Sequence, residues 1–191
     1  SNAGFENWDG GAPAVWKSNI GNAALSQSST AHSGQYAVKV TGDARANKRL
    51  SYAELSLKAG TYTFTYYVYG AEANAHLKTG YAIMTDHKVA DFKTDYIYSD
   101  PTTVTQGAWS LVTYTFKLDR PKTICLLVMN QKGSGAFLVD DAQLTTSNGG
   151  LQYPSPQHRI CLAGAGRPHP HFPTPLAHPV RAVCFLSTTR P

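Results

Sequence analysis

The stretch from Gly60 to Gly70, GTYTFTYYVYG, decides the fold class of this chain. Alternate side chains of a β-strand point to opposite faces of the sheet. Here the even-numbered positions carry one apolar face, formed by Tyr62, Phe64, Tyr66 and Val68. The other face carries threonines and, toward its end, Tyr67 and Tyr69. Strict alternation between two glycines predicts a strand that is buried on one side only.

Several other segments show the same alternation between turn-forming residues. They are Gln35–Val40, Gly80–Thr85, Trp109–Leu118, Thr123–Asn130 and Ala136–Leu144. Glycine, proline and asparagine clusters separate them, and no long amphipathic helix is visible in the pattern. Several short strands of this kind predict an all-β protein, specifically a β-sandwich of the jelly-roll type.

Composition limits the classes of function. Residues 1–150 hold 13 Lys and Arg against 12 Asp and Glu, whereas residues 151–191 hold four Arg and no acid. The body of the chain is therefore close to neutral, which argues against nucleic-acid binding. No apolar run reaches the about eighteen residues of a membrane span, so none is predicted.

The chain divides into three parts. Residues 1–3 resemble the remnant of a cleaved expression tag, and the domain that follows spans residues 4–146. An irregular Pro/His-rich tail covers residues 147–191; eight of the 11 prolines lie in the last 41 residues. Two interpretations of the tail stay open: a flexible linker, and sequence foreign to the native protein. Its histidines and cysteines do not have the spacing of a zinc site.

Five short motifs, in order along the chain, resemble the carbohydrate-binding modules of the family 4/9 type. They are Gly4–Trp8, Ala31–Val40, Leu57–Phe64, Trp109 and Phe137–Leu144. The resemblance covers residues 4–146 and implies a galactose-binding-like jelly roll. Such domains are also found in surface proteins and secreted enzymes of gut Bacteroidetes, which implies a secreted or cell-surface location.

The resemblance also implies a structural calcium ion. Its ligands would be the carboxylates of Glu6 and Asp140, with backbone oxygens near Ser33 and Gln35. Calcium takes about six to eight oxygen ligands and favours carboxylates among them. Asp141 is expected to point to the face opposite Asp140. The alternative is that the two carboxylates cap turns or pair with Lys39.

Aromatic side chains indicate where a sugar would bind. Aromatic faces stack on the C–H surfaces of sugar rings, and the resemblance places such residues on the sheet face opposite the core. Tyr67 and Tyr69 occupy that face of their strand. The alternative is that tyrosine–threonine pairs across strands stabilise the sheet and bind nothing.

Polar residues complete the predicted binding site. Asp86 lies just after a neighbouring strand, and Asn130 and Gln131 end another, so these side chains are expected to read sugar hydroxyls. Trp16 is expected to flank the site from a loop. The other two tryptophans, Trp8 and Trp109, are expected in the core.

The sequence therefore predicts a non-catalytic, carbohydrate-binding accessory domain. Its partner would be a polysaccharide or other glycan, and it would act as a monomer within a larger multidomain protein. No nucleophile elbow or phosphate-binding loop is present in the pattern, so no enzyme activity is expected. The alternative function is a structural or protein-adhesion module without a sugar site.

Overall fold

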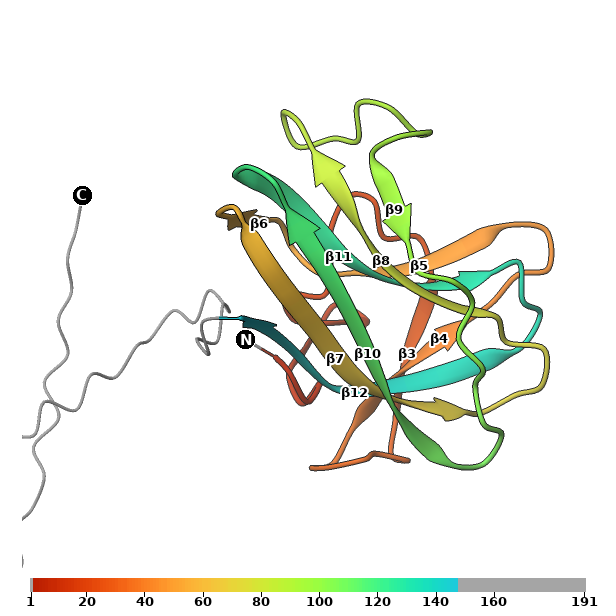
Figure 1. The fold of residues 1–191 in the computed structure, drawn as a ribbon. Coiled ribbons are helices and arrows are strands. Elements are labelled where there is room, and N and C mark those ends of the chain that lie inside the picture. Colours follow the sequence, from red (N-terminus) through yellow and green to blue (C-terminus); the bar gives the residue numbers. More distant parts are fainter. Residues whose placement is uncertain (1, 148–191) are drawn as a thin grey trace, which may run out of the picture. The chain divides into compact units, whose positions relative to one another are not determined.

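The computed structural model describes residues 2–147, and all twelve regular elements in them are β-strands (Figure 1). The strands are β1 (Trp8–Asp9), β2 (Ala12–Pro13), β3 (Ala24–Ser28), β4 (Ala37–Thr41), β5 (Asn47–Ser51), β6 (Leu55–Leu57), β7 (Gly60–Gly70), β8 (Leu77–Met84), β9 (Tyr96–Tyr98), β10 (Trp109–Leu118), β11 (Lys122–Gln131) and β12 (Ala136–Thr146). Within this part of the chain, no helix has the length and apolar character needed to cross a membrane. Except for its first residue, the predicted tail lies outside the described residues.

The strands form two antiparallel sheets and one short pair. The first, here called the front sheet, has the order β10-β7-β12-β4-β3. The second, the back sheet, has the order β5-β11-β8-β9, and β6 also pairs with β11. Strands β1 and β2 pair with each other. Figure 1 shows the two sheets facing one another, which confirms the predicted all-β sandwich.

The core fills the space between the two sheets. Strand β7 contributes the apolar face predicted from its alternation, and β11 contributes Ile124, Leu126 and Val128 from the other side. Tyr66 is fully buried, and its hydroxyl lies 2.5 Å from the Thr79 hydroxyl. A buried tyrosine is tolerated when its hydroxyl finds such a partner. Burial raises the pKa of Tyr66 well above its usual range.

Trp16 belongs to this core, so its expected role beside the binding site is wrong. Its side chain is 2% exposed. The ring centroid lies 4.9 Å from Phe5 and 4.9 Å from Tyr52. Its indole nitrogen donates a hydrogen bond to the Asn2 carbonyl at 3.1 Å. The N-terminal segment folds over the ring, which leaves no aromatic face for a sugar.

Residues 2 and 3 are part of the fold, although the sequence alone gave no reason to include them. The Asn2 amide donates to the carbonyls of Asn7 and Ala14 at 2.7 and 3.2 Å. The Ala3 carbonyl accepts a hydrogen bond from Ala142 N at 2.8 Å. These bonds tie the start of the chain to the residues that flank the β1–β2 pair and to β12.

Candidate functional site

Two acidic side chains hold the loop between β3 and β4. Asp140 Oδ2 accepts hydrogen bonds from the backbone N–H groups of His32 and Ser33, at 2.8 and 3.1 Å. Glu6 Oε1 accepts one from the backbone N–H of Gln35 at 3.0 Å. The structure thus brings together all four residues predicted to bind calcium, around a single loop. Calcium binding itself stays a prediction.

Asp141 does not point away from Asp140 as expected. The pairing register of β12 with β7 shifts between Asp140 and Gln143, and Asp141 has a positive φ of 48°. The Asp141 carboxylate contacts His32 Nδ1 at 2.7 Å and accepts a hydrogen bond from Ser33 Oγ at 2.6 Å. The expectation from simple alternation is wrong here because a β-bulge breaks the alternation.

The carboxylates of Glu6 and Asp140 accept backbone N–H groups of the loop, as in the alternative that they cap turns. Asp140 is fully buried, and desolvation raises its pKa despite the backbone N–H groups that it accepts. It makes no ion pair with a lysine or arginine among the described residues, and Lys39, its alternative partner, pairs with Glu72 at 2.5 Å. Within residues 2–147, no three His, Cys, Asp or Glu side chains gather as a metal site. A calcium ion here would therefore depend on backbone carbonyls as well as the carboxylates.

An aromatic cluster lies on the outer face of the front sheet; we call His32, Tyr67, Tyr69 and Trp109 the front cluster. The His32 and Tyr67 rings stack with centroids 3.5 Å apart and planes at 13°. Tyr69 and Trp109 are cross-strand neighbours, with centroids 5.4 Å apart. Trp109 is partly exposed. The expectation that it is a core residue is wrong because its strand position places it on the outer side, beside Tyr69.

The front cluster offers less open aromatic surface than the sequence implied. His32 covers one face of Tyr67, and the contact of its imidazole with Asp141 fixes it there. The side chain opposite Tyr67 on β10 is Leu111, which is 57% exposed. Tyr69 and Trp109 therefore present most of the aromatic surface that remains.

The three predicted polar residues do not join Tyr67 and Tyr69. Asn130 is fully buried: its amide donates to the Gly135 carbonyl at 2.9 Å and its Oδ1 accepts from His76 N at 3.0 Å. Its expected ligand role is wrong because its amide already holds two loops together. Asp86 lies in the exposed turn after β8, and Gln131 ends β11, so both belong to the back sheet. The predicted binding site lined by all these residues is therefore not formed.

A second group of aromatic residues lies along the edge of the back sheet; we call Phe92, Tyr96 and Tyr98 the back aromatic row. The Phe92 and Tyr96 centroids are 6.0 Å apart with planes at 23°. Tyr96 and Tyr98 are 6.1 Å apart and nearly parallel, at 2°. Phe92 is 75% exposed. Tyr96 and Tyr98 share the outer face of β9, which pairs with β8 (Figure 1).

Polar groups surround the back aromatic row. The Arg49 guanidinium lies 5.1 Å from the Tyr96 centroid, a cation–π contact. Burial raises the pKa of Tyr98 to about 12, and nearby Arg49 partly offsets this effect. The Tyr98 hydroxyl and Asn47 Oδ1 are buried without a hydrogen bond of ordinary geometry among the described residues. Strand β5 places Asn47 and Arg49 on the outer face of the same sheet.

Little in the sequence indicated this second surface. Strand β9 is only three residues long, and β5 has the polar sequence NKRLS. Neither segment shows the alternation of a half-buried strand. The only available signal was the pair of tyrosines, Tyr96 and Tyr98, at a spacing of two.

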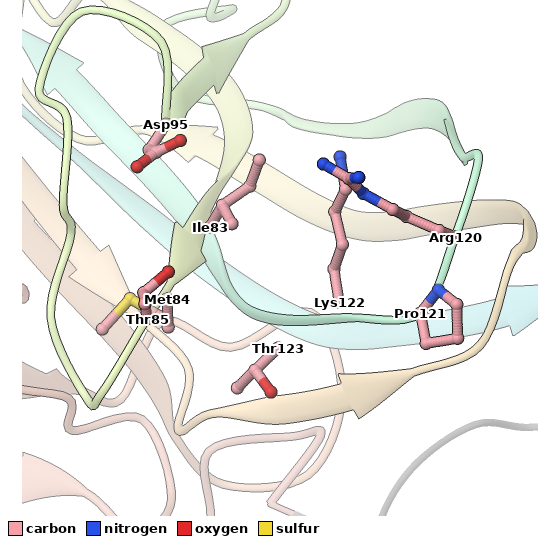
Figure 2. Close-up of a pocket in the computed structure, with 8 residues that line it drawn as sticks. All are labelled: Ile83, Met84, Thr85, Asp95, Arg120, Pro121, Lys122 and Thr123. Atoms are coloured by element: carbon pink, nitrogen blue, oxygen red, sulfur yellow. The ribbon is translucent and has the colours of Figure 1, made fainter.

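A pocket of about 350 Å³ opens near the start of β9, where β8 ends and β11 begins; we call it the end pocket (Figure 2). It is lined by Ile83, Met84, Thr85, Asp95, Arg120, Pro121, Lys122 and Thr123. In Figure 2 the charged ends of Arg120 and Lys122 extend toward the same part of the pocket. Asp95 lies on the wall that leads into β9.

Solved structures show that this domain has a known β-sandwich fold, the jelly roll. The CBM22-1 xylan-binding domain of Paenibacillus barcinonensis Xyn10C is 18% identical, with a TM-score of 0.54 over 75% of this chain and 90% of that one. The CBM22-2 xylan-binding domain of the same protein is 16% identical, with a TM-score of 0.53 over 72% and 94%. An arabinose-bound GH51 α-L-arabinofuranosidase is 12% identical, with a TM-score of 0.52 over 76% and 26%. At these identities the similarity establishes the fold.

The chain belongs to the carbohydrate-binding domain family CBM 4/9, whose model matches residues 1–134. Membership confirms the resemblance drawn from the five sequence motifs, and with it the jelly-roll fold and carbohydrate binding as the function of the domain. A comparison with curated proteins returned no match.

Proposed function

We propose that the domain holds its glycan on the back aromatic row. The observation that carries this proposal is the exposed Phe92 ring, which stacks with Tyr96, and the Arg49 guanidinium that lies over the Tyr96 ring. The Arg49 guanidinium would donate hydrogen bonds to sugar hydroxyls, while the C–H faces of the sugar ring stack on Phe92.

Binding of this kind is reversible and needs no chemical step. We therefore propose a non-catalytic accessory domain, monomeric and carried within a larger secreted or cell-surface protein. Family membership supports the binding role. The parent protein's activity is a separate question, because some proteins with this fold, such as the arabinofuranosidase above, are enzymes.

The first test removes the exposed ring of the row. Phe92→Ala should weaken retention on a glycan array by about tenfold or more, since about 1.4 kcal/mol of lost stacking corresponds to that factor. The melting temperature should stay unchanged because the ring is 75% exposed. Affinity electrophoresis in a gel that contains the best-bound glycan of the array compares the retardation of the variant with that of the wild type.

Tyr69→Ala is the matched control on the opposite sheet. If the glycan binds on the back aromatic row, this variant retains wild-type binding. The predicted site at Tyr67 and Tyr69 gains a neighbouring ring from Trp109, so it remains the competing surface. Loss of retention in Tyr69→Ala, with Phe92→Ala unaffected, would move the site to the front cluster. No retention by a folded wild-type domain across a broad panel would favour the structural or adhesion module.

We also propose that calcium binds at the loop site, held by Glu6 and Asp140 with backbone oxygens near Ser33 and Gln35. The support is the burial of the Asp140 carboxylate without a cationic partner and the convergence of both acids on one loop. Bound calcium would neutralise these carboxylates and fix the loop against β12. It would serve the fold and take no part in chemistry.

Calcium removal provides the corresponding prediction. Calcium at about 100 times its Kd should stabilise the domain by about 2.7 kcal/mol, and chelator should lower the melting temperature accordingly. Asp140→Asn should abolish this difference between calcium and chelator. Glu72→Gln, an exposed acid paired with Lys39, should keep it. Identical melting curves for the wild type in calcium and chelator would remove the calcium proposal.

A further inference from the structure

We propose that the end pocket binds the anionic group of an acidic sugar, so that the domain selects glycans carrying a carboxylate or a sulfate. This inference rests on the proposed function and names the class of glycan. It begins with the pocket's volume of about 350 Å³, which falls within the ~300–1,000 Å³ of small-molecule sites.

The pocket and the back aromatic row share one segment of chain. Thr85 and Asp95 line the pocket, and the loop between them carries Phe92. Asp95 directly precedes Tyr96, and its carbonyl accepts a hydrogen bond from Ile83 N at 2.8 Å. The 85–95 segment thus connects the pocket lining to the back aromatic row.

The charges in the pocket favour an anion. Arg120 and Lys122 both line it, two residues apart across Pro121 in the β10–β11 connection. Lys122 pairs with Asp119 at 3.3 Å, outside the pocket lining, whereas Arg120 makes no ion pair among the described residues. The two cations share the pocket with the Asp95 carboxylate, which forms no ion pair with Arg120, so the guanidinium is available for bidentate binding of an anion.

The remaining lining is suited to a sugar ring. Ile83, Met84 and Pro121 supply apolar surface for its C–H groups. The Asp95 carboxylate on the opposite wall already accepts a hydrogen bond from Asp91 N at 2.9 Å. Its free lone pairs would accept sugar hydroxyls, while Arg120 takes the anionic substituent. The arrangement separates a hydroxyl-binding wall from an anion-binding wall.

The test uses three sugars that share one stereochemistry: galactose, galacturonic acid and galactose 6-sulfate. Each is titrated into 15N-labelled protein, and the Nε–Hε signal of Arg120 is followed by NMR. We expect concentration-dependent shifts with galacturonic acid, galactose 6-sulfate or both, and none with galactose. Arg120→Gln and Lys122→Gln should each reduce the affinity for the anionic sugars by about tenfold. Lys117→Gln, which removes an exposed lysine of β10, should leave it unchanged.

The three sugars and the variants distinguish a failure of the pocket proposal from a failure of the proposed glycan surface. Carboxylate and sulfate are told apart by which sugar shifts the Arg120 signal. Equal responses to galactose and to both anionic sugars would overturn the inference and leave the proposed glycan surface intact. Shifts at Arg120 that persist while Phe92→Ala has no effect on glycan retention would keep the pocket and reject the back aromatic row. If Arg120→Gln binds the anionic sugars with wild-type affinity, the proposal that the end pocket binds an anionic group is also overturned.

Discussion

The Trp16→Ala variant should lose about 3–5 kcal/mol of its free energy of unfolding, the usual cost of deleting a large buried aromatic ring. The indole is 2% exposed and packs within 4.9 Å, centroid to centroid, of Phe5 and Tyr52. Its removal would leave a cavity and deprive the Asn2 carbonyl of the indole N–H. Urea denaturation followed by circular dichroism measures the loss, which is a large part of a small domain's stability.

The neighbouring residue supplies a control for this substitution. Lys17 is exposed, so Lys17→Ala should stay within about 0.5 kcal/mol of the wild type. A Trp16→Ala variant as stable as this control, with weakened glycan binding, would return Trp16 to the binding surface. The structure leads us to expect the reverse, a strong loss of stability from a residue that contacts no ligand.

Gly80→Ala should damage the fold and the proposed site together. A Cβ at this position would lie 2.0 Å from the Ile97 carbonyl oxygen and 2.8 Å from Tyr98 Cδ1. Because the nearer obstacle is backbone, β9 must move away from β8. We expect a cost of about 1–3 kcal/mol. The shift of Tyr98 should also weaken glycan retention, which array binding and urea denaturation measure on the same sample.

Gly21→Ala tests whether any added methyl group would have this effect. Its Cβ would lie 3.4 Å from the Ser18 carbonyl oxygen and 3.5 Å from Ser51 Cβ, which are ordinary contacts. This variant should therefore match the wild type in stability and binding. Equal behaviour of the Gly80 and Gly21 variants would show that β9 does not approach β8 as closely as described.

The predicted strand boundaries were accurate where a segment carries its own pattern. The strand predicted at Gly60–Gly70 is found with those limits, as is the one at Trp109–Leu118. Their alternation follows from one buried face, a property that neighbouring residues express directly. Strands β5 and β9 lack this alternation because they are fixed by hydrogen bonds to other strands, β11 and β8, and the partner of β5 is distant in sequence.

At the loop site, too, some features could be predicted from the sequence and others only from the tertiary structure. The motifs placed Glu6, Ser33, Gln35 and Asp140 in one functional group, and the structure gathers them around one loop. The position of Asp141 could not be predicted in the same way. A bulge is an extra residue relative to a paired strand, so it exists only once β12 is set against β7.

By itself, the sequence determined the all-β class, the apolar face of β7 and the family of the domain. Tertiary structure alone decided which aromatic residues are available to a ligand. Trp16 is buried under the N-terminal segment, Trp109 lies on an outer face, and Phe92 stands exposed beside β9. The physical reason is that alternation assigns a side chain to one face of its strand, whereas its exposure depends on which distant loop or strand covers that face.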